Sequence, residues 1–268
     1  MISGVVLLLD IGNTHVHCGL ADARRLRRRW DFPTVELRTP TSRAKAGAAL
    51  REWVGRDRIM DAAVCSVVPA ATARAVALVR RLFSVTPVCL NHTNLRGLGI
   101  DYPKLETIGQ DRLANALAAR TRFGAPVITI GFGTAVIIDV VNSQGAFVGG
   151  VIAPGLDLVT SYLHEKTAQL PVIQIREPRS LIGRSTEEAM RVGAVVGYRG
   201  YVRELIGGLK RELNVDKVPV IATGGYAPLL AKHLPEITQV ERGLTLEGVR
   251  LWWLGCQAAI SPPSKSVR

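Results

Sequence analysis

The chain has 268 residues, of which 47% are hydrophobic and 21% charged. These values are typical of a soluble globular protein with one or two domains. No apolar run approaches the roughly 18 residues of a membrane-spanning helix, and the first apolar run is too short for a signal peptide. We therefore expect a protein without a membrane partner. The cysteines lack CxxC spacing, which predicts reduced thiols in the cytoplasm rather than disulfides or a metal site: Cys18, Cys65, Cys89 and Cys256.

The net charge of +12 raises the question of a polyanionic partner. Its densest run, from Arg24 to Arg29, contains five arginines but no interleaved aromatic residue and no nucleic-acid-binding motif. We interpret this run as the charged edge of a sheet, where arginines discourage pairing with another chain, rather than as a nucleic-acid site.

The first forty residues predict a three-stranded meander. Residues 5–9 form an unbroken apolar run that stops at Asp10, and residues 15–21 alternate between apolar and polar. Between them, Gly12 and Asn13 tolerate positive φ, so we expect a sharp turn with inward-facing amides that attract an anion. A carboxylate beside such a turn suits a Mg²⁺ ion bridging to phosphate. A plain hairpin turn explains the same residues equally well.

Alternating units follow the meander. Its third strand is expected over residues 28–37, and strands are expected over 62–67 and 85–90, with helices over 42–54 and 70–83. After a loop over 91–110, Asp111 opens a further helix that Gly124 and Pro126 end. Hairpins followed by alternating units predict a mixed sheet with helices on its faces.

The second half repeats this plan. Strands predicted over 127–130, 135–141 and 146–152 again enclose a short turn, which contains Gly133 and Thr134. The remaining elements fit the same unit: helices over 158–163, from the Ser185 capping box to about 213, over 228–233 and over 245–259, and strands over 218–222 and 238–240. We predict an α/β protein with an N-terminal domain over 1–122, a C-terminal domain over 123–260, a frayed tail over 261–268 and a ligand cleft between the domains.

Five motifs occur in the order and spacing of the type III pantothenate kinases, a family that includes the Bvg accessory factors: Asp10-x-Gly-Asn-Thr, Tyr102 with Gly109-Gln110-Asp111-Arg112, Gly133-Thr134-Ala135, Gly149-Gly150 with Ala153-Pro154-Gly155, and Thr223-Gly224-Gly225. The chain resembles this family from about residue 5 to 255. The resemblance implies an actin/hexokinase-like fold of two ribonuclease-H-like domains. It further implies a homodimer with substrate near the subunit interface, and ATP-dependent phosphorylation of pantothenate to 4'-phosphopantothenate, the first step of coenzyme A biosynthesis.

The resemblance also assigns roles to residues. Asp111 falls on the proton acceptor, and the pantothenate positions are Tyr102, Gly109, Gln110, Asp111, Arg112 and Thr186. The ATP positions are Asp10, Ile11, Gly12, Asn13, Thr14, His15, Val16, His17, Gly133, Thr134, Gly224 and Gly225. This assignment suits the chemistry, because phosphoryl transfer needs positioned phosphates, charge neutralisation and a group that accepts the hydroxyl proton. Arg112 has the fork that binds a substrate carboxylate.

One position departs from the family pattern. Gly131 stands where relatives usually have an Asp linked to a monovalent cation, K⁺ or NH₄⁺, and glycine offers no ligand. We therefore expect either a kinase that is at most weakly dependent on such cations or a catalytically weakened nucleotide-binding accessory protein. A sugar kinase of the same fold is a weaker alternative, because the Gly109–Arg112 segment resembles the pantothenate enzymes.

Simpler interpretations exist for several of these residues. Asp111 also fits an ordinary helix N-cap, and Thr186 fits the first turn of a helix. His15 and His17 lie in phase on one strand, but no third metal ligand is evident. The Gly131-Phe132-Gly133 segment precedes a strand rather than a helix, which argues against a dinucleotide fingerprint.

Overall fold

The computed structural model describes residues 4–260, so the predicted frayed tail lies outside the described residues. The described residues fall into two compact units. The first unit runs through Ala118 and includes the residues from Gly243 onward, and the second is Ala119–Arg242. The division falls four residues before the predicted boundary at 122.

The first unit contains a mixed sheet with strand order β3-β2-β1-β4-β5. Strands β1, β2 and β3 form the predicted antiparallel meander, whereas β4 runs parallel to β1 and β5 parallel to β4. The strands are β1 (Val5–Ile11), β2 (His15–Ala21), β3 (Leu26–Pro33), β4 (Ile59–Ser66) and β5 (Val88–Cys89).

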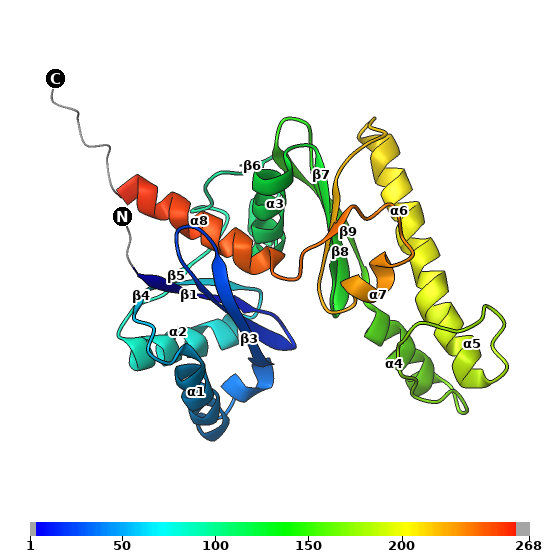
Figure 1. Ribbon diagram of the computed structural model, residues 1–268, viewed down its shortest axis with the longest axis horizontal. Helices are drawn as coiled ribbons and strands as arrows, with labels where there is room; N and C mark the ends of the chain where they lie inside the picture. Colours follow the sequence, from blue (N-terminus) through cyan, green and yellow to red (C-terminus); the bar gives the residue numbers. More distant parts are fainter. Residues whose placement is uncertain (1–3, 261–268) are drawn as a thin grey trace. The chain divides into compact units, whose positions relative to one another are not determined.

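Four helices pack against this sheet (Figure 1). They are α1 (Pro40–Val54), α2 (Pro69–Phe83), α8 (Leu244–Ile260) and α3 (Gln110–Phe123), whose last turn falls in the second unit. The predicted loop over 91–110 also contains β6 (Gly99–Ile100) and the 3₁₀ turn η2 (Leu105–Thr107).

The third strand is shorter than predicted. It ends at Pro33, and Thr34–Leu37 form a 3₁₀ turn, η1, instead of continuing the strand. Proline has no N–H to donate to a sheet. Thr34 then donates its backbone N–H to the Thr14 carbonyl at 2.9 Å and its hydroxyl to the Gly12 carbonyl at 2.7 Å, which draws the chain over the β1–β2 turn.

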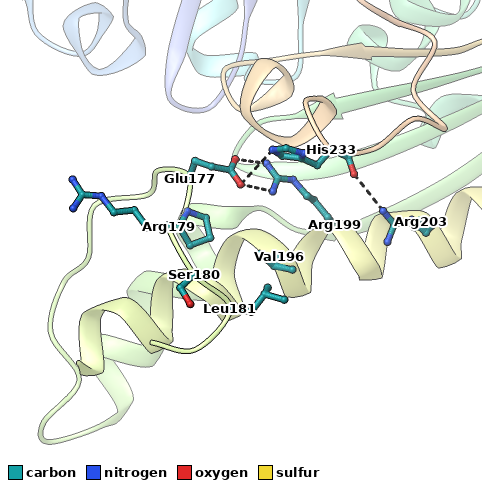
Figure 2. A pocket seen from close by; sticks show the side chains of 9 residues that line it. Glu177, Arg179, Ser180, Leu181, Val196, Arg199, Arg203 and His233 are labelled. Atoms are coloured by element: carbon teal, nitrogen blue, oxygen red, sulfur yellow. Dashed lines mark hydrogen bonds and ion pairs between the residues drawn. The ribbon is translucent and has the colours of Figure 1, made fainter. Parts of the chain in front are cut away.

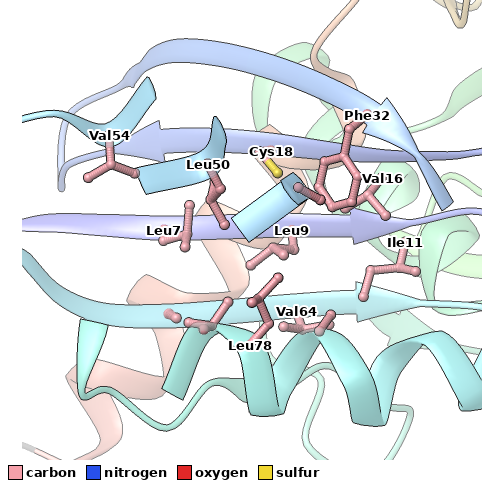
Figure 3. Close-up of a cluster of buried hydrophobic side chains, with 14 of the residues drawn as sticks. Leu7, Leu9, Ile11, Val16, Cys18, Phe32, Leu50, Val54, Val64 and Leu78 are labelled. Carbon is pink, nitrogen blue, oxygen red and sulfur yellow. The ribbon is translucent and has the colours of Figure 1, made fainter. Parts of the chain in front are cut away.

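Strand β1 is buried on both faces, which explains its unbroken apolar sequence. Leu7, Leu9 and Ile11 belong to the core that α1 and α2 cover, together with Leu50 and Leu78 (Figure 3). The alternate residues Val6 and Leu8 belong to a second core cluster, with Ala114 and Leu117 of α3 and the tryptophans of α8. Asp10 is in phase with Val6 and Leu8 and is therefore the first polar residue at the end of this second face.

Helix α8 belongs to the first unit, which corrects the prediction that residues up to 260 form one C-terminal domain. Trp252 donates its indole N–H to the Asn94 carbonyl at 3.0 Å, and Trp253 donates to an Asp61 carboxylate oxygen at 2.6 Å. A Cβ at Gly248 would lie 1.9 Å from the Ala114 carbonyl oxygen, so the missing side chain allows α8 to approach α3 closely.

The second unit repeats the connectivity of the first, as the sequence predicted. Its strands follow the order β11-β10-β7-β8-β9, with an antiparallel β7-β8-β9 meander and with β10 parallel to β7. They are β7 (Val127–Phe132), β8 (Ala135–Val141), β9 (Ala146–Pro154), β10 (Val220–Thr223) and β11 (Gln239–Val240). The helices are α4 (Leu156–Lys166), α5 (Thr186–Val192), α6 (Tyr198–Glu212) and α7 (Ala227–Ala231).

The predicted long helix after Ser185 is helical but contains a π-helical turn, η3 (Gly193–Gly197), between α5 and α6. The Ser185 half of its capping box is present: Glu188 donates its backbone N–H to the Ser185 hydroxyl oxygen at 3.2 Å. The Glu188 carboxylate accepts the backbone N–H of Arg184, one residue before the N-cap, at 2.7 Å instead of that of Ser185. Within the described part of the chain, no helix is long and apolar enough to cross a bilayer. All four cysteines are free thiols.

Candidate functional site

The turn between β1 and β2 is tight, but not for the predicted reason. Neither Gly12 nor Asn13 adopts a positive φ. The Gly12 N–H closes the hairpin on the His15 carbonyl at 3.0 Å, and a Cβ at Gly12 would lie 3.3 Å from that oxygen. The expectation of a left-handed turn is therefore wrong. It follows that the Gly12 N–H is already used within the hairpin, while Asn13 and Thr14 are exposed.

Asp10 lies at the end of β1 and is half-buried. Burial raises the pKa of its carboxyl to about 7, with the Asp111 and Asp31 charges acting in the same direction and the His17 charge opposing them. Among the described residues, none donates a hydrogen bond to this carboxylate. Asp10 is therefore an ionisable group whose negative charge needs a cation to stabilise it.

Three polar residues form a row across neighbouring strands. Asp10 pairs directly with His17 on β2, and His17 pairs directly with Asp31 on β3. Direct cross-strand partners lie on the same face of a sheet. The His17 Nδ1 atom is 2.8 Å from Asp31 Oδ1, and the His15 ring stacks on the His17 ring with 6.1 Å between centroids. His15 and His17 are both exposed.

Asp111 lies in the first turn of α3. Its Oδ1 accepts the backbone N–H of Arg112 at 2.9 Å. Burial raises the pKa of the Asp111 carboxyl, although the hydrogen bond from the Arg112 amide and the Arg112 charge oppose this effect. The charges of Asp10 and Asp111 interact, so the structure brings these two predicted residues together. Raised carboxyl pKa values at one place are typical of functional sites.

The other residues predicted to bind substrate in the first unit surround Asp111 in sequence. A Cβ at Gly109 would lie 2.5 Å from Asp111 Oδ1, so the glycine allows the carboxylate its position. The Gly109 carbonyl accepts the backbone N–H groups of Arg112 and Leu113 at the start of α3. Arg112 is buried, and Tyr102 and Gln110 are half-buried.

In the second unit, two turns and the start of a helix meet at one end of the sheet. Gly133 donates its N–H to the Ala135 carbonyl at 3.1 Å, and Gly155 donates to the Thr134 carbonyl at 3.0 Å. A Cβ at Gly155 would lie 2.3 Å from the Gly133 and Thr134 carbonyl oxygens. A Cβ at Gly224, whose φ is +95°, would lie 2.4 Å from the Phe132 carbonyl oxygen.

These contacts place the Gly133–Thr134 turn, the start of α4 and the Thr223–Gly225 turn side by side. Gly133, Thr134 and Gly225 are exposed, so their backbone is accessible to a ligand. Thr186, also exposed, lies apart in sequence at the first position of α5. The second unit thus has a backbone-lined surface without predicted ionisable side chains, whereas both central carboxylates lie in the first unit.

Two interactions at these sites were not foreseen. The sequence assigns no role to Asp31, because its pairing with His17 depends on the register of β2 and β3. Asp157 accepts a hydrogen bond from the Tyr226 hydroxyl at 2.5 Å, which joins α4 to the residue that follows Gly225. Burial and this hydrogen bond raise the pKa of Tyr226 to about 12. In the sequence, only the period-2 pattern of β3 indicates the face of the strand on which Asp31 lies.

The arrangement fits a divalent metal held jointly with phosphate. Among the described residues, no group of three or more His, Cys, Asp or Glu side chains is arranged to hold a metal ion. Asp10 nevertheless offers a carboxylate that lacks a hydrogen-bond donor, and Mg²⁺ is commonly bound by one or two carboxylates plus substrate phosphates and water. A metal here therefore requires the phosphates as its other ligands.

A cavity of about 360 Å³ lies elsewhere in the second unit (Figure 2). Arg199 crosses it and binds both Glu177 carboxylate oxygens, at 2.8 and 2.6 Å, while it also donates to the Leu229 and Leu230 carbonyls. Arg203 is paired with Glu236. No predicted site residue lines this cavity, and its central arginine is already satisfied, so we assign it a structural role.

Known proteins resemble this chain in sequence and in fold. The family described as type III pantothenate kinase matches residues 6–207. The type III pantothenate kinase of Methylacidiphilum infernorum (isolate V4) is 42% identical over 248 residues, which cover 92% of this chain and 87% of that protein.

Two solved structures have the same fold. The activator of the 2-hydroxyisocaproyl-CoA dehydratase from Clostridium difficile with bound ADPNP has a TM-score of 0.53 at 13% identity, covering 98% of this chain and 100% of that one. A ROK family glucokinase from Streptomyces griseus with glucose and AMPPNP also has a TM-score of 0.53, at 15% identity, covering 95% and 100%. These likenesses agree with an actin/hexokinase-like fold of two ribonuclease-H-like units.

Proposed function

Because the chain belongs to the type III pantothenate kinase family, we propose that Asp10 and Asp111 perform separate tasks in phosphoryl transfer from ATP to pantothenate. The family assignment makes the chain an ATP-dependent kinase that forms 4'-phosphopantothenate in coenzyme A biosynthesis. The single observation that supports the division of tasks is the proximity of two half-buried aspartates with raised carboxyl pKa values, one at a strand end and one in a helix's first turn.

In this proposal, Asp111 accepts the proton of the pantothenate hydroxyl. Its raised pKa makes the carboxylate a better proton acceptor than an exposed aspartate. The Arg112 amide holds one carboxylate oxygen at 2.9 Å, which leaves the other oxygen for the hydroxyl. The remaining pantothenate contacts are proposed for Tyr102, Gly109, Gln110, Arg112 and Thr186.

Asp10 and the β1–β2 turn are proposed to bind the ATP phosphates together with Mg²⁺. When bound, the metal neutralises charge on the phosphates. Asp10 supplies its carboxylate to that ion, directly or through water, and the side of the turn formed by Asn13–His17 faces the phosphates. The exposed backbone at Gly133, Thr134, Gly224 and Gly225 is proposed as a second nucleotide contact, since adjacent glycines let a flat base approach the main chain.

The test is formation of phosphopantothenate by the purified chain with ATP, Mg²⁺ and pantothenate. We expect turnover that requires both pantothenate and Mg²⁺. A chain that binds the non-hydrolysable analogue AMPPNP but forms no phosphopantothenate would instead support the accessory-protein alternative. Glucose replaces pantothenate as acceptor in the control, which tests the sugar-kinase alternative.

Gly131 leads to a prediction about monovalent cations. A Cβ at this position would have only ordinary contacts, 3.8 Å to the Ile137 carbonyl oxygen and 3.9 Å to Thr223, so packing does not require the glycine. We expect the wild-type rate to change less than about twofold between 0 and 100 mM KCl, because no carboxylate is present to hold the cation. The variant Gly131→Asp should fold and gain activation by K⁺. Gly131→Asn is the matched control without the charge, and steep K⁺ activation of the wild type would contradict this interpretation.

The oligomeric state is proposed to be a homodimer formed through the second unit. Large apolar side chains are exposed on β9, α4, the segment before α5, and α6. Exposed apolar side chains in such number are typical of protein interfaces. They are Ile152, Leu158, Tyr162, Leu163, Val172, Leu181, Ile182 and Tyr201.

The most exposed of these residues offers the test. Ile182 is 76% exposed, so Ile182→Asp should fold normally yet disrupt an interface by burying an unpaired charge. We expect light scattering to give twice the chain mass of 28.9 kDa for the wild type and the single mass for the variant. Val35→Asp, at a position 55% exposed in the first unit, is the control and should remain dimeric. A wild type with the mass of one chain would contradict the proposal.

We place the reaction in the cytoplasm, where ATP is available and where the free thiols are stable. No nucleic-acid partner is proposed for the arginine run at 24–29. Arg27 pairs with Asp22 at 2.6 Å and Arg28 pairs with Asp57 at 2.7 Å, so part of that charge is used within the first unit.

A further inference from the structure

The ion pair between His17 and Asp31 has little value for stability. The two side chains are 47% and 56% exposed, and exposed ion pairs contribute little to the free energy of unfolding. The pair nevertheless lies in a direct cross-strand row with Asp10, at the end of the sheet where the β1–β2 turn emerges. The exposed His17–Asp31 pair is therefore better explained by the orientation that it gives to the His17 ring than by a contribution to folding stability.

The contact also determines which imidazole nitrogen remains available. Asp31 Oδ1 lies 2.8 Å from His17 Nδ1, and a carboxylate at one ring nitrogen fixes both the ring orientation and the tautomer. His15 stacks on the same ring at 6.1 Å with 24° between the planes, which restricts its rotation further. With Nδ1 held by Asp31, Nε2 is the nitrogen left for a ligand.

The turn beside this ring needs additional donors. The Gly12 N–H already donates to the His15 carbonyl at 3.0 Å, so it is not available to a phosphate oxygen. Three carboxylates, Asp10, Asp31 and Asp111, interact electrostatically here, which makes the place unfavourable for an anion without compensating positive groups. The oriented His17 ring, on the strand that follows the turn, supplies such a group in its imidazolium form, which is positively charged and has Nε2–H as a donor.

We propose that Asp31 is a positioning residue for nucleotide binding, holding the His17 ring by Nδ1 so that the Nε2–H of the imidazolium form donates to the phosphates of the nucleotide. This inference rests on the proposed function, because it takes the β1–β2 turn as the phosphate site. Asp31 acts only through His17 and does not touch the nucleotide itself.

Binding of AMPPNP with Mg²⁺, measured by calorimetry, tests the proposal. Asp31→Asn and His17→Gln should each raise the Kd about three- to tenfold, and the double variant should bind no more weakly than the weaker single variant. In the kinase assay, Asp31→Asn should raise the KM for ATP by a similar factor with kcat within about twofold, and Asp31→Glu should restore part of the affinity. Asp57→Asn is the matched control, because Asp57 forms an exposed pair with Arg28 in the same unit.

The tautomer provides a readout that does not depend on activity. Long-range ¹⁵N–¹H correlation of the imidazole rings should show a protonated, hydrogen-bonded Nδ1 for His17 in the wild type, with its signal identified by its loss in His17→Gln. The signal should move in Asp31→Asn and stay unchanged in Asp57→Asn. A His17 ring that is insensitive to Asp31→Asn would overturn the proposal, as would an unchanged Kd in that variant.

The two possible failures are distinguishable. A wild-type chain that phosphorylates pantothenate while Asp31→Asn binds nucleotide normally contradicts the positioning role alone. A wild-type chain that binds AMPPNP but makes no phosphopantothenate contradicts the proposed function, and the effect of Asp31→Asn on Kd still decides the positioning role. A wild-type chain that binds no nucleotide overturns both.

Discussion

Replacing Asp111 by asparagine is expected to lower kcat for phosphopantothenate formation by about 10²–10⁴-fold. Asparagine keeps the shape of the side chain and the contact with the Arg112 amide, but it cannot accept the hydroxyl proton. The KM for ATP should stay within about twofold, because Asp111 is assigned to the acceptor and not to the nucleotide. Steady-state kinetics with both substrates varied provide the measurement.

The control for this variant is Glu106→Gln. Glu106 is an exposed carboxylate in the 3₁₀ turn before α3 and has no role in the proposal. Its replacement should leave kcat unchanged. If Asp111→Asn retained most of the wild-type kcat, Asp111 would be an ordinary first-turn carboxylate, which is the simpler interpretation of its position.

Replacing Asp10 by asparagine should have opposite effects on activity and stability. The kinase rate should fall by about 10²-fold or more, because the proposed metal contact and its charge are lost. The free energy of unfolding of the ligand-free protein should rise at alkaline pH. A residue that lowers the stability of the ligand-free protein but is required for activity is expected at a functional site.

The direction of this stability change follows from the pKa of Asp10, which folding raises from 3.8 to about 7 through burial. Below pH 4 the carboxyl is protonated in both states, so the stabilisation from its tighter proton binding in the folded state is fully present. As the pH rises through 7, this contribution is lost, because the folded protein must then bury a charge that the unfolded chain exposes to water. The cost in the wild type is on the order of a few kcal/mol at pH 8.5, and the neutral asparagine avoids it.

Urea unfolding at pH 5 and pH 8.5, without nucleotide or metal, measures this effect. The stability gain of Asp10→Asn over the wild type should be larger at pH 8.5. The control is Asp22→Asn, which should be destabilising at neutral pH. The Arg25 amide and the Arg27 side chain hold the pKa of Asp22 at about 2, so its ionised form is favoured by folding. A pH-independent difference for Asp10→Asn would contradict the buried, raised carboxyl.

Mg²⁺ with AMPPNP should reverse the order of stabilities at pH 8.5. A ligand that binds only the folded protein stabilises it in proportion to the logarithm of its concentration over Kd. The wild type should therefore gain more than Asp10→Asn. An equal gain in both proteins would mean that Asp10 does not contact the metal–nucleotide complex.

Much of this protein was readable from its sequence because the relevant signals are local. The apolar run before Asp10, the period-2 segment after it and the Ser185 capping box each predicted an element that the structure contains. The second copy of the meander was visible for the same reason. The motif around Asp111 pointed to the family, and the structure places Asp111 in the first turn of a helix and within electrostatic reach of Asp10.

Other features depend on contacts between distant segments, and no local pattern contains them. The sequence of β3 shows that Asp31 alternates with apolar neighbours, but only the β2–β3 register places it opposite His17. The assignment of α8 to the first unit depends on Trp252, Trp253 and the close approach at Gly248. The raised pKa of Asp10 likewise comes from burial, which is a property of the packed molecule. Local periodicity and turn chemistry thus determined the elements and their repeat, whereas strand register and packing decided which charges meet, because those depend on residues far apart in the chain.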